Sequence, residues 1–363
     1  MQLKNIEIKN FRCFSQKVVN LDSKIVLVQG ENGTGKSSLL EALHYLCYLR
    51  SFRTSCPQDL IQFSQTGFFA KALFSLGDEQ KVCHNLQVGF EQKKRSVKLN
   101  KKVVTSFKEL MDHYRVITLT EDDLFLIKGG PDGRRQFIDQ AILLGDQNYS
   151  LEMRSFKKVL LNRNSLLQTR RCTKELYELW TEQLWHKSRY LQERRVGLLA
   201  QFQEIVNDVL AQTFDEKIEV RLEYRSKKNS LDFNFNSFME HQVGLDFFEQ
   251  ENRFGRSLFG AHLDDIVISF QGKKSKQFAS RGQQKLTVLL LKVAQLRVLE
   301  QRRGASVLLL DDFMTDFDPK RLRVLADFLS ILPNQKIFTS PSQKGPFELL
   351  IKSLGAKIVR LTN

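Results

Sequence analysis

Hydrophobic and polar residues change their spacing several times along the chain, and each change marks a segment with a different predicted structure. Near the N-terminus they alternate, as at Ile6 and Ile8, which is typical of strands with one buried face. Residues 68–119 hold further short alternating segments, and the polar pair Asn100–Lys101 suits a turn. We therefore predict an antiparallel sheet in this part of the chain.

The period of the pattern changes at residue 121. As far as residue 215, apolar residues recur at intervals of three and four, and glycine and proline are nearly absent after Pro131. We predict a helical lobe here, too short to project a long coiled coil. Strands are expected again at residues 217–225 and 266–270, followed by a helix at residues 283–301.

The last part of the chain contains an unbroken apolar run, SVLLLDD at residues 306–312. Such a run is typical of a parallel strand that is buried on both faces. Two further strands, KIFTS and AKIVRLT, follow it. Because helices and strands of these types combine along one chain, we predict an α/β fold with mixed sheets.

Residues 30–37, GENGTGKS, lie between an apolar strand and a predicted helix and match the pattern G-x-x-x-x-G-K-[ST] of a phosphate-binding P-loop. The glycines let the backbone N–H groups point at phosphate oxygens. We expect Lys36 to bind the β- and γ-phosphates of ATP and the Ser37 hydroxyl to ligate Mg²⁺. The other residues of this predicted nucleotide site are Gly30, Glu31, Asn32, Gly33, Thr34, Gly35 and Ser38.

Asp311 and Asp312 end the apolar run and supply the second half of the predicted site. We expect Asp311 to hold the Mg²⁺ through water, and Asp312 to position or deprotonate the attacking water. Together with Lys36 they are the candidate catalytic residues. Because aspartate is one methylene shorter than glutamate, the sequence predicts slow hydrolysis.

A second candidate phosphate site is ASRGQQKLTVLLL at residues 279–291, where a small and polar stretch opens an apolar helix. A helix N-terminus attracts anions, although serine at such a position also serves as an ordinary N-cap. The stretch SRGQQ resembles the signature of ATP-binding-cassette (ABC) ATPases. This resemblance implies that Ser280, Gly282 and Gln283 contact ATP held by another subunit.

The same resemblance extends to the residues after the apolar strand. In TDFDPKRL it implies that Asp318 lies at a dimer interface. Such ATPases carry a histidine after the next core strand, where this chain has Thr339 and Ser340.

Longer stretches resemble the RecF family of the SMC-like ATPase branch. They are LKNIEIKNFRCF, EALHYLCYLRSFRT, LTEDDLFLIKGGPDGRRQFID, FKKVLLNRNSLLQ, FGAHLDDI and SRGQQKLTVLLLKVAQL. The family's GPHRDD is GAHLDD here, with Ala261 and Leu263 as the changed residues, and the contribution of this loop to nucleotide or DNA contact is open.

The resemblance implies a P-loop ABC-type ATPase head, formed by residues 1–120 and 216–363, into which the helical lobe of residues 121–215 is inserted. It implies an ATP-dependent homodimer with slow, DNA-stimulated ATP hydrolysis. The dimer would bind duplex and single-stranded DNA and work with RecO and RecR at single-strand gaps, in recombinase loading and SOS induction. The ATPase subunit of an ABC transporter and a non-hydrolysing DNA clamp are the alternatives.

The chain is strongly basic. Its 363 residues include 56 Lys and Arg against 41 Asp and Glu, a net charge of +15, which favours a polyanionic partner such as nucleic acid or an anionic membrane surface, and charge alone does not choose between the two. We expect phosphate contacts without sequence preference. The candidate DNA contacts are Arg50, Arg53, Lys93, Lys94, Arg95, Lys157 and Lys158. Other basic positions considered are Arg154, Arg163, Arg170, Arg171, Lys273, Lys274 and Lys276.

Three smaller observations complete the prediction. Trp180 and Trp185 stand at helical spacing among leucines, so we expect them in the core rather than stacked on bases. The five cysteines show no CxxC pairing, which favours neither a disulfide framework nor a zinc site. Since neither a signal peptide nor an 18-residue apolar run is found, we expect a cytoplasmic protein without membrane contact.

Overall fold

The computed structural model of the chain describes residues 1–76, 82–106, 110, 113–169, 173–214, 218–227, 234–243, 246–303, 306–341 and 345–362. The chain divides into two compact units. Unit 1 comprises Met1–Asp123, Thr213–Asp215 and Gln295–Asn363, and unit 2 comprises Leu124–Gln212 and Glu216–Ala294. Arg170 and Arg171 lie outside the described residues.

Unit 1 contains the predicted antiparallel sheet. Its strand order is β2-β1-β4-β5-β6-β7, and neighbouring strands pair antiparallel. The strands are β1 (Gln2–Phe11), β2 (Phe14–Asn20), β4 (Gly67–Leu76), β5 (Val82–Glu91), β6 (Lys94–Leu99) and β7 (Lys102–Val103). The expected turn forms at Asn100 and Lys101, both of which have positive φ angles and join β6 to β7.

The second sheet of unit 1 is parallel, in the order β14-β3-β13-β12-β8. Its strands are β3 (Ile25–Gly30), β8 (Val116–Leu119), β12 (Val307–Leu310), β13 (Gln335–Pro341) and β14 (Lys357–Arg360). All four residues of β12 are buried, as expected for a strand covered on both faces. This sheet brings the end of the P-loop strand, at Gly30, next to β13, which in turn pairs with β12.

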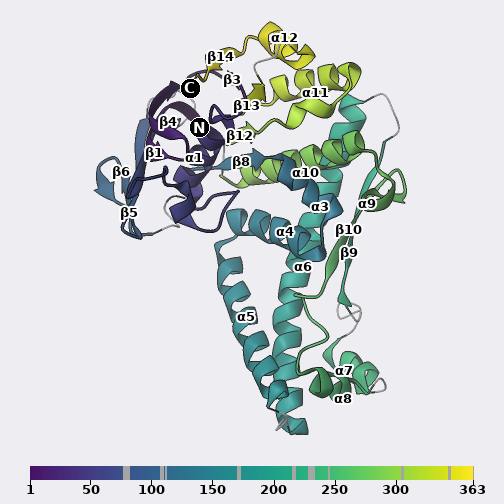
Figure 1. The fold of residues 1–363 in the computed structure, drawn as a ribbon. Helices are drawn as coiled ribbons and strands as arrows, with labels where there is room; N and C mark the ends of the chain where they lie inside the picture. The colour runs from purple at the N-terminus through teal and green to yellow at the C-terminus, as the bar shows by residue number, and fades with distance from the viewer. Residues whose placement is uncertain are drawn as a thin grey trace. The chain divides into compact units, whose positions relative to one another are not determined.

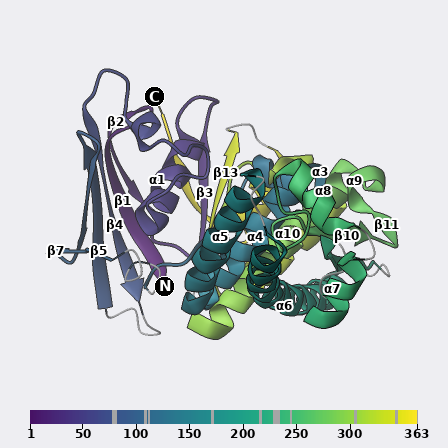
Figure 2. The same ribbon diagram turned by 90° about the horizontal axis from the view of Figure 1, so that it is seen from below.

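Helix α1 (Lys36–Tyr48) packs against both sheets and lies between them (Figure 2). Eleven of its thirteen residues are buried, because it presents apolar side chains to a sheet on either side. Further elements that the structure describes in unit 1 are η1 (Pro57–Leu60), η4 (Phe313–Asp316), α11 (Pro319–Ile331) and α12 (Pro346–Ser353), and η2 (Glu121–Leu124) ends at the first residue of unit 2.

Unit 2 contains the predicted helical segment. Its helices here are α3 (Phe125–Lys128), α4 (Pro131–Gly145), α5 (Gln147–Gln168) and α6 (Lys174–Thr213). Helices α5 and α6 run side by side, and Lys187 on α6 pairs with Glu152 on α5 at 2.8 Å (Figure 1). Trp185 is buried against Phe235, as its spacing predicted, while Trp180 is half-buried.

Unit 2 also includes residues that the sequence grouped with the C-terminal part of the ATPase head. These elements are α7 (Phe235–Val243), α8 (Phe247–Phe254), α9 (Ser275–Phe278), and a three-stranded sheet of β9 (Val220–Arg225), β10 (Asp265–Phe270) and β11 (Lys273–Lys274). Helix α10 (Arg281–Arg303) contributes residues to both units. Long-range contacts tie the described residues between 218 and 294 to the helices of unit 2, whereas the sequence-based division fell at residue 216.

The GAHLDD loop supplies many of those contacts. The Asp264 carboxylate is fully buried and accepts hydrogen bonds from Gln192 Nε2 at 2.6 Å, Tyr224 Oη at 2.7 Å and the Lys227 N–H at 2.7 Å. Asp265 accepts two bonds from the Arg134 guanidinium, at 2.9 and 3.0 Å. In this structure both aspartates hold the loop to its surroundings within unit 2.

Arg163 corrects one sequence-based interpretation. It was considered among the basic positions that face DNA, yet it is 1% exposed and forms an ion pair with the buried carboxylate of Glu251. It also donates to Ser257 Oγ at 2.7 Å and Thr181 Oγ1 at 2.9 Å. Pairing of the Nη1 and Nη2 groups in this way offsets the cost of burying the charge, so Arg163 braces the packing of α5, α6 and α8.

None of the helices in the part of the chain that the structure describes is both long enough and apolar enough to cross a membrane.

Candidate nucleotide-binding site

The loop between β3 and α1 has a backbone that only glycine accommodates at its critical positions. Gly33 and Gly35 adopt φ angles of 88° and 92°, in the left-handed region. A Cβ atom on Gly35 would lie 2.5 Å from the Phe14 ring, and one on Gly30 would lie 2.7 Å from the carbonyl oxygen of Leu361. The loop is therefore tightly curled and closely packed against its neighbours. This conformation lets its backbone N–H groups point at phosphate oxygens.

Lys36 lies over this loop. It is 9% exposed, and its ammonium donates to the carbonyl oxygens of Gly30 at 2.8 Å and Glu31 at 2.9 Å. Since an ammonium has three donors, one N–H remains for a phosphate oxygen. Glu31, Asn32 and Gly33 are exposed at the tip of the loop.

Asp311 connects the loop to two strands of the parallel sheet. Its Oδ1 atom accepts a hydrogen bond from Ser37 Oγ at 3.0 Å and another from Thr339 Oγ1 at 2.8 Å. Its backbone N–H donates to the Leu119 carbonyl at 2.8 Å. The structure thus brings the predicted metal-binding residues Ser37 and Asp311 together.

Asp312 follows at a sharp change of backbone direction, with φ 47° in the left-handed region. Its N–H donates to Thr339 Oγ1 at 2.8 Å. Thr339 therefore touches both members of the carboxylate pair. The other candidate after the core strand, Ser340, has its hydroxyl 3.3 Å from the Pro341 carbonyl oxygen instead.

These residues fit a nucleoside triphosphate with a divalent cation. The hydroxyl of Ser37 and the carboxylate of Asp311 offer oxygen atoms, the donors that Mg²⁺ prefers. The curled loop and the Lys36 ammonium offer N–H groups for the phosphates.

One residue beside the site was not identified from the sequence. Glu41 lies on α1 and is fully buried, and its carboxylate accepts two bonds from the Arg12 guanidinium, at 2.9 and 2.8 Å, which raise the pKa of Arg12. Ser51 Oγ donates to it as well, and Arg53 lies 3.8 Å away. The signal in the sequence is a single acidic residue inside the apolar run LLEALHYL.

Ser280 and Gln283 belong to unit 2 and form a capping box at the start of α10. The Gln283 N–H donates to Ser280 Oγ at 3.3 Å, and the Ser280 N–H donates to Gln283 Oε1 at 2.8 Å. Ser280 is exposed and Gly282 is half-buried. The cap accounts for the stability of the helix start, while contact of these residues with a partner's nucleotide remains a prediction.

Asp318 has a comparable place at the start of α11. Its carboxylate accepts from the Arg321 N–H at 3.0 Å and caps the helix, and its side chain is about half exposed. Its predicted position at a dimer interface likewise stays a prediction.

The candidate DNA contacts are distributed over both units. Arg50, Arg53 and Arg95 line one pocket of unit 1, and Lys93 and Lys94 lie exposed at the turn between β5 and β6. Lys157 and Lys158 are exposed on α5, in unit 2. The exposed positions are suited to phosphate contacts.

The comparison with known proteins decides the family. The model of the RecF/RecN/SMC N terminal domain matches residues 2–349. A DNA replication and repair protein RecF from Natranaerobius thermophilus is 30% identical over 343 residues, which cover 90% of this chain and 87% of that protein. The chain belongs to the RecF family. A second RecF, from Citrifermentans bemidjiense, is 29% identical over 94% of this chain and 93% of its own length.

Solved structures agree with this RecF assignment. The structure of the recombination mediator protein RecF with ATP, in the RecFOR pathway, covers 94% of this chain and 92% of that protein with a TM-score of 0.80 at 26% identity. An Smc head domain from Pyrococcus furiosus shares the fold, with a TM-score of 0.56 at 17% identity. The predicted α/β fold of an ATPase head is therefore confirmed.

Proposed function

We propose that the protein is an ATP-dependent, DNA-binding recombination mediator. Its RecF relatives are named DNA replication and repair proteins, and the similar solved structure is that of a recombination mediator protein with ATP. One observation carries the proposal: the side chains of Ser37 on α1 and Thr339 on β13 both lie within hydrogen-bond distance of Asp311, which directly follows β12. This arrangement, together with membership of the RecF family, supports ATP as the nucleotide.

In this proposal Ser37 and Asp311 would hold a Mg²⁺ ion, and the chemistry that such an ion would supply is neutralisation of charge on the phosphates. The backbone of residues 30–35 and the Lys36 ammonium bind the β- and γ-phosphates. Asp312 orients the attacking water and accepts its proton. Thr339 fixes the positions of Asp311 and Asp312 relative to each other, because its hydroxyl donates to the Asp311 carboxylate and accepts from the Asp312 N–H.

The proposed switch is dimerisation. Ser280, Gly282 and Gln283 of one copy would complete the nucleotide site of another, with Asp318 at the interface, so that ATP favours the dimer. The exposure of Ser280 and the helix N-terminus at that residue support this role. Hydrolysis would be slow and stimulated by DNA, and the dimer would act with RecO and RecR partners at single-strand gaps, in recombinase loading and the SOS response.

Two measurements test the proposal together. Fluorescence anisotropy of labelled duplex and single-stranded DNA, at fixed salt with and without ATP, should show tighter binding with ATP. Phosphate release should be slow and rise when duplex DNA is added. Lys36→Met should lose both effects of ATP, because it removes the ammonium from the loop. ATP-dependent binding without any phosphate release would instead favour a non-hydrolysing clamp.

A further inference from the structure

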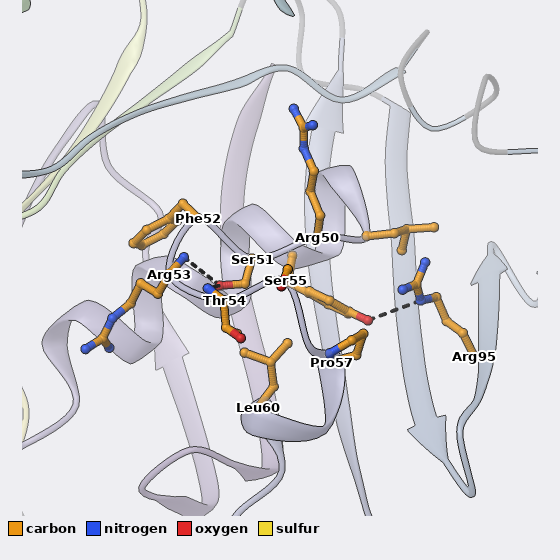
Figure 3. Close-up of a pocket in the computed structure, with 11 residues that line it drawn as sticks. Arg50, Ser51, Phe52, Arg53, Thr54, Ser55, Pro57, Leu60 and Arg95 are labelled. Carbon is orange, nitrogen blue, oxygen red and sulfur yellow. Dashed lines mark hydrogen bonds between the residues drawn. The ribbon is translucent and has the colours of Figure 1, made fainter. Parts of the chain in front are cut away.

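A partly enclosed pocket of about 470 Å³ borders the C-terminal end of α1 in unit 1 (Figure 3). It is formed by Tyr45 of α1, by the segment that follows α1, by η1 and by Arg95 of β6. Its volume falls within the range of small-ligand sites, roughly 300–1,000 Å³. The same helix begins at the P-loop, so the pocket and the nucleotide site lie at its two ends.

The charge of this pocket favours an anion. Arg50, Arg53 and Arg95 all line it, and none of the described residues that line it is acidic. Figure 3 shows Arg50 and Arg53 extending to different sides of the loop, while Arg95 reaches in from β6. Guanidinium groups placed around one pocket suit phosphate oxygens, to which arginine donates two parallel hydrogen bonds.

Arg95 is held in place by the P-loop helix. Its Nε donates to the hydroxyl of Tyr45 at 3.1 Å, and its guanidinium lies 5.4 Å from the centre of the Tyr45 ring. Such a contact adds a cation–π attraction and orients the side chain. Arg53 lies 3.8 Å from Glu41, whose charge Arg12 already offsets with two hydrogen bonds.

The pocket also has an apolar side, formed by the half-buried residues Leu49, Phe52 and Pro57. A phosphate alone gains nothing from such a surface, whereas the base of a nucleotide packs on apolar and aromatic side chains. In a duplex the bases are stacked inside the helix, so a protein contacts it through phosphates and groove edges without a pocket of this kind.

We propose that this pocket binds one unpaired nucleotide, with its phosphate on Arg95, which reaches in from β6, and its base against Leu49, Phe52 and Pro57; Arg50 and Arg53 add positive charge at the sides of the loop. The source of that nucleotide is a single strand of nucleic acid. The inference rests on the DNA-binding function proposed above and specifies which form of DNA this surface takes. A free mononucleotide offers the same chemistry, and the test below distinguishes it from a nucleotide within a single strand.

The test compares variants of the full-length protein by fluorescence anisotropy at fixed salt, on an unpaired oligothymidine and on a duplex of equal length. Arg95→Ala removes one pocket cation, and Ser55→Phe fills the pocket from an exposed lining residue without changing the charge. Lys98→Ala is the matched control, because Lys98 is exposed on the same strand β6 but does not line the pocket. Binding of thymidine monophosphate is measured on the Lys36→Met protein, so that the P-loop does not contribute.

We expect Arg95→Ala, which removes the phosphate contact, and Ser55→Phe, which blocks the base contact, each to weaken binding of the single strand by about fivefold or more. Both variants should change the affinity for the duplex much less. Lys98→Ala should lower the affinity for the single strand and for the duplex by similar factors. Equal effects of all three variants on both DNAs would overturn the inference. So would tight binding of thymidine monophosphate with unchanged single-strand affinity in Ser55→Phe, which would assign the pocket to a free nucleotide. Absence of DNA binding by the unaltered protein would instead refute the proposed function itself.

Discussion

Ser37 Oγ lies 3.0 Å from Asp311 Oδ1, although 274 residues separate the two in the chain. The first residue sits in the opening turn of α1, and the second directly follows β12. The parallel pairing of β3 with β13, and of β13 with β12, creates this proximity. A hydroxyl and a carboxylate that meet at the ends of parallel strands are suited to hold one cation between them.

Thr339→Val should slow phosphate release by roughly ten- to a hundredfold, the usual effect of removing a group that orients a metal ligand. The change keeps the shape of the side chain but removes the hydroxyl that bonds Asp311 and the Asp312 N–H. Thr339→Ser retains the hydroxyl and is the control. Steady-state phosphate release with saturating ATP measures the effect, and equal rates for the two variants would contradict the role of the hydroxyl.

Ser280→Asp should leave ATP binding intact and prevent ATP-dependent dimerisation. Aspartate caps a helix as well as serine does, so α10 should keep its start, while the added negative charge would repel a partner's γ-phosphate. Ser280→Asn introduces a neutral residue that also caps well, so it distinguishes the effect of the added charge from an effect on the helix cap. Sedimentation velocity with ATP gives the result, and a Ser280→Asp protein that still dimerises would exclude the cross-subunit contact.

Arg163→Met should lower the free energy of unfolding by about 3 kcal/mol, because it leaves the buried Glu251 carboxylate without its ion pair. Urea unfolding measures this loss. Arg154→Met, at an exposed position of the same helix, should change stability by less than about 0.5 kcal/mol. The slope of DNA affinity against salt should be the same for Arg163→Met and the unaltered protein, since a buried arginine touches no phosphate.

His262 should make stability depend on pH. Burial, and then the nearby arginines, lower the pKa of His262 from 6.5 to about 4. Between these values the unfolded chain binds a proton that the folded chain does not, so the free energy of unfolding falls as the pH falls through this window. His262→Gln removes that contribution. Urea unfolding at several pH values from 7 to 4.5 should therefore show a smaller decline for the variant, and parallel curves would refute the prediction.

Lys93 and Lys94 should contribute to DNA binding through phosphates alone. Replacing both by alanine should reduce the slope of log affinity against log salt by about 1.8 on duplex DNA, about 0.9 for each lost contact. Lys352→Ala removes a lysine that is already paired with Glu348 at 2.6 Å and serves as the control. An unchanged slope in the double variant would remove this turn from the DNA-binding surface.

The sequence alone determined the features that depend on neighbouring residues. The P-loop was predictable because the spacing of its glycines, Lys36 and Ser37 satisfies a local requirement of the backbone. The buried strand at residues 307–310, the turn at Asn100–Lys101 and the helical segment were predictable from periodicity, since the pattern of burial along one element repeats with its geometry. Longer stretches that resemble RecF sequences also indicated the RecF family.

Only the tertiary structure decided features that join distant residues. It buried Arg163 against Glu251, although Arg154 and Lys158 on the same helix are exposed, because the partner of the ion pair comes from a helix 88 residues away. It placed Thr339 rather than Ser340 against Asp311, because the register of β13 beside β12 sets which hydroxyl faces the carboxylate. It also brought Arg95 to the end of α1, through the pairing of β6 with β5 and the contact with Tyr45. Long-range packing determines which side chains contact one another, and no local pattern of residues in the sequence predicts it.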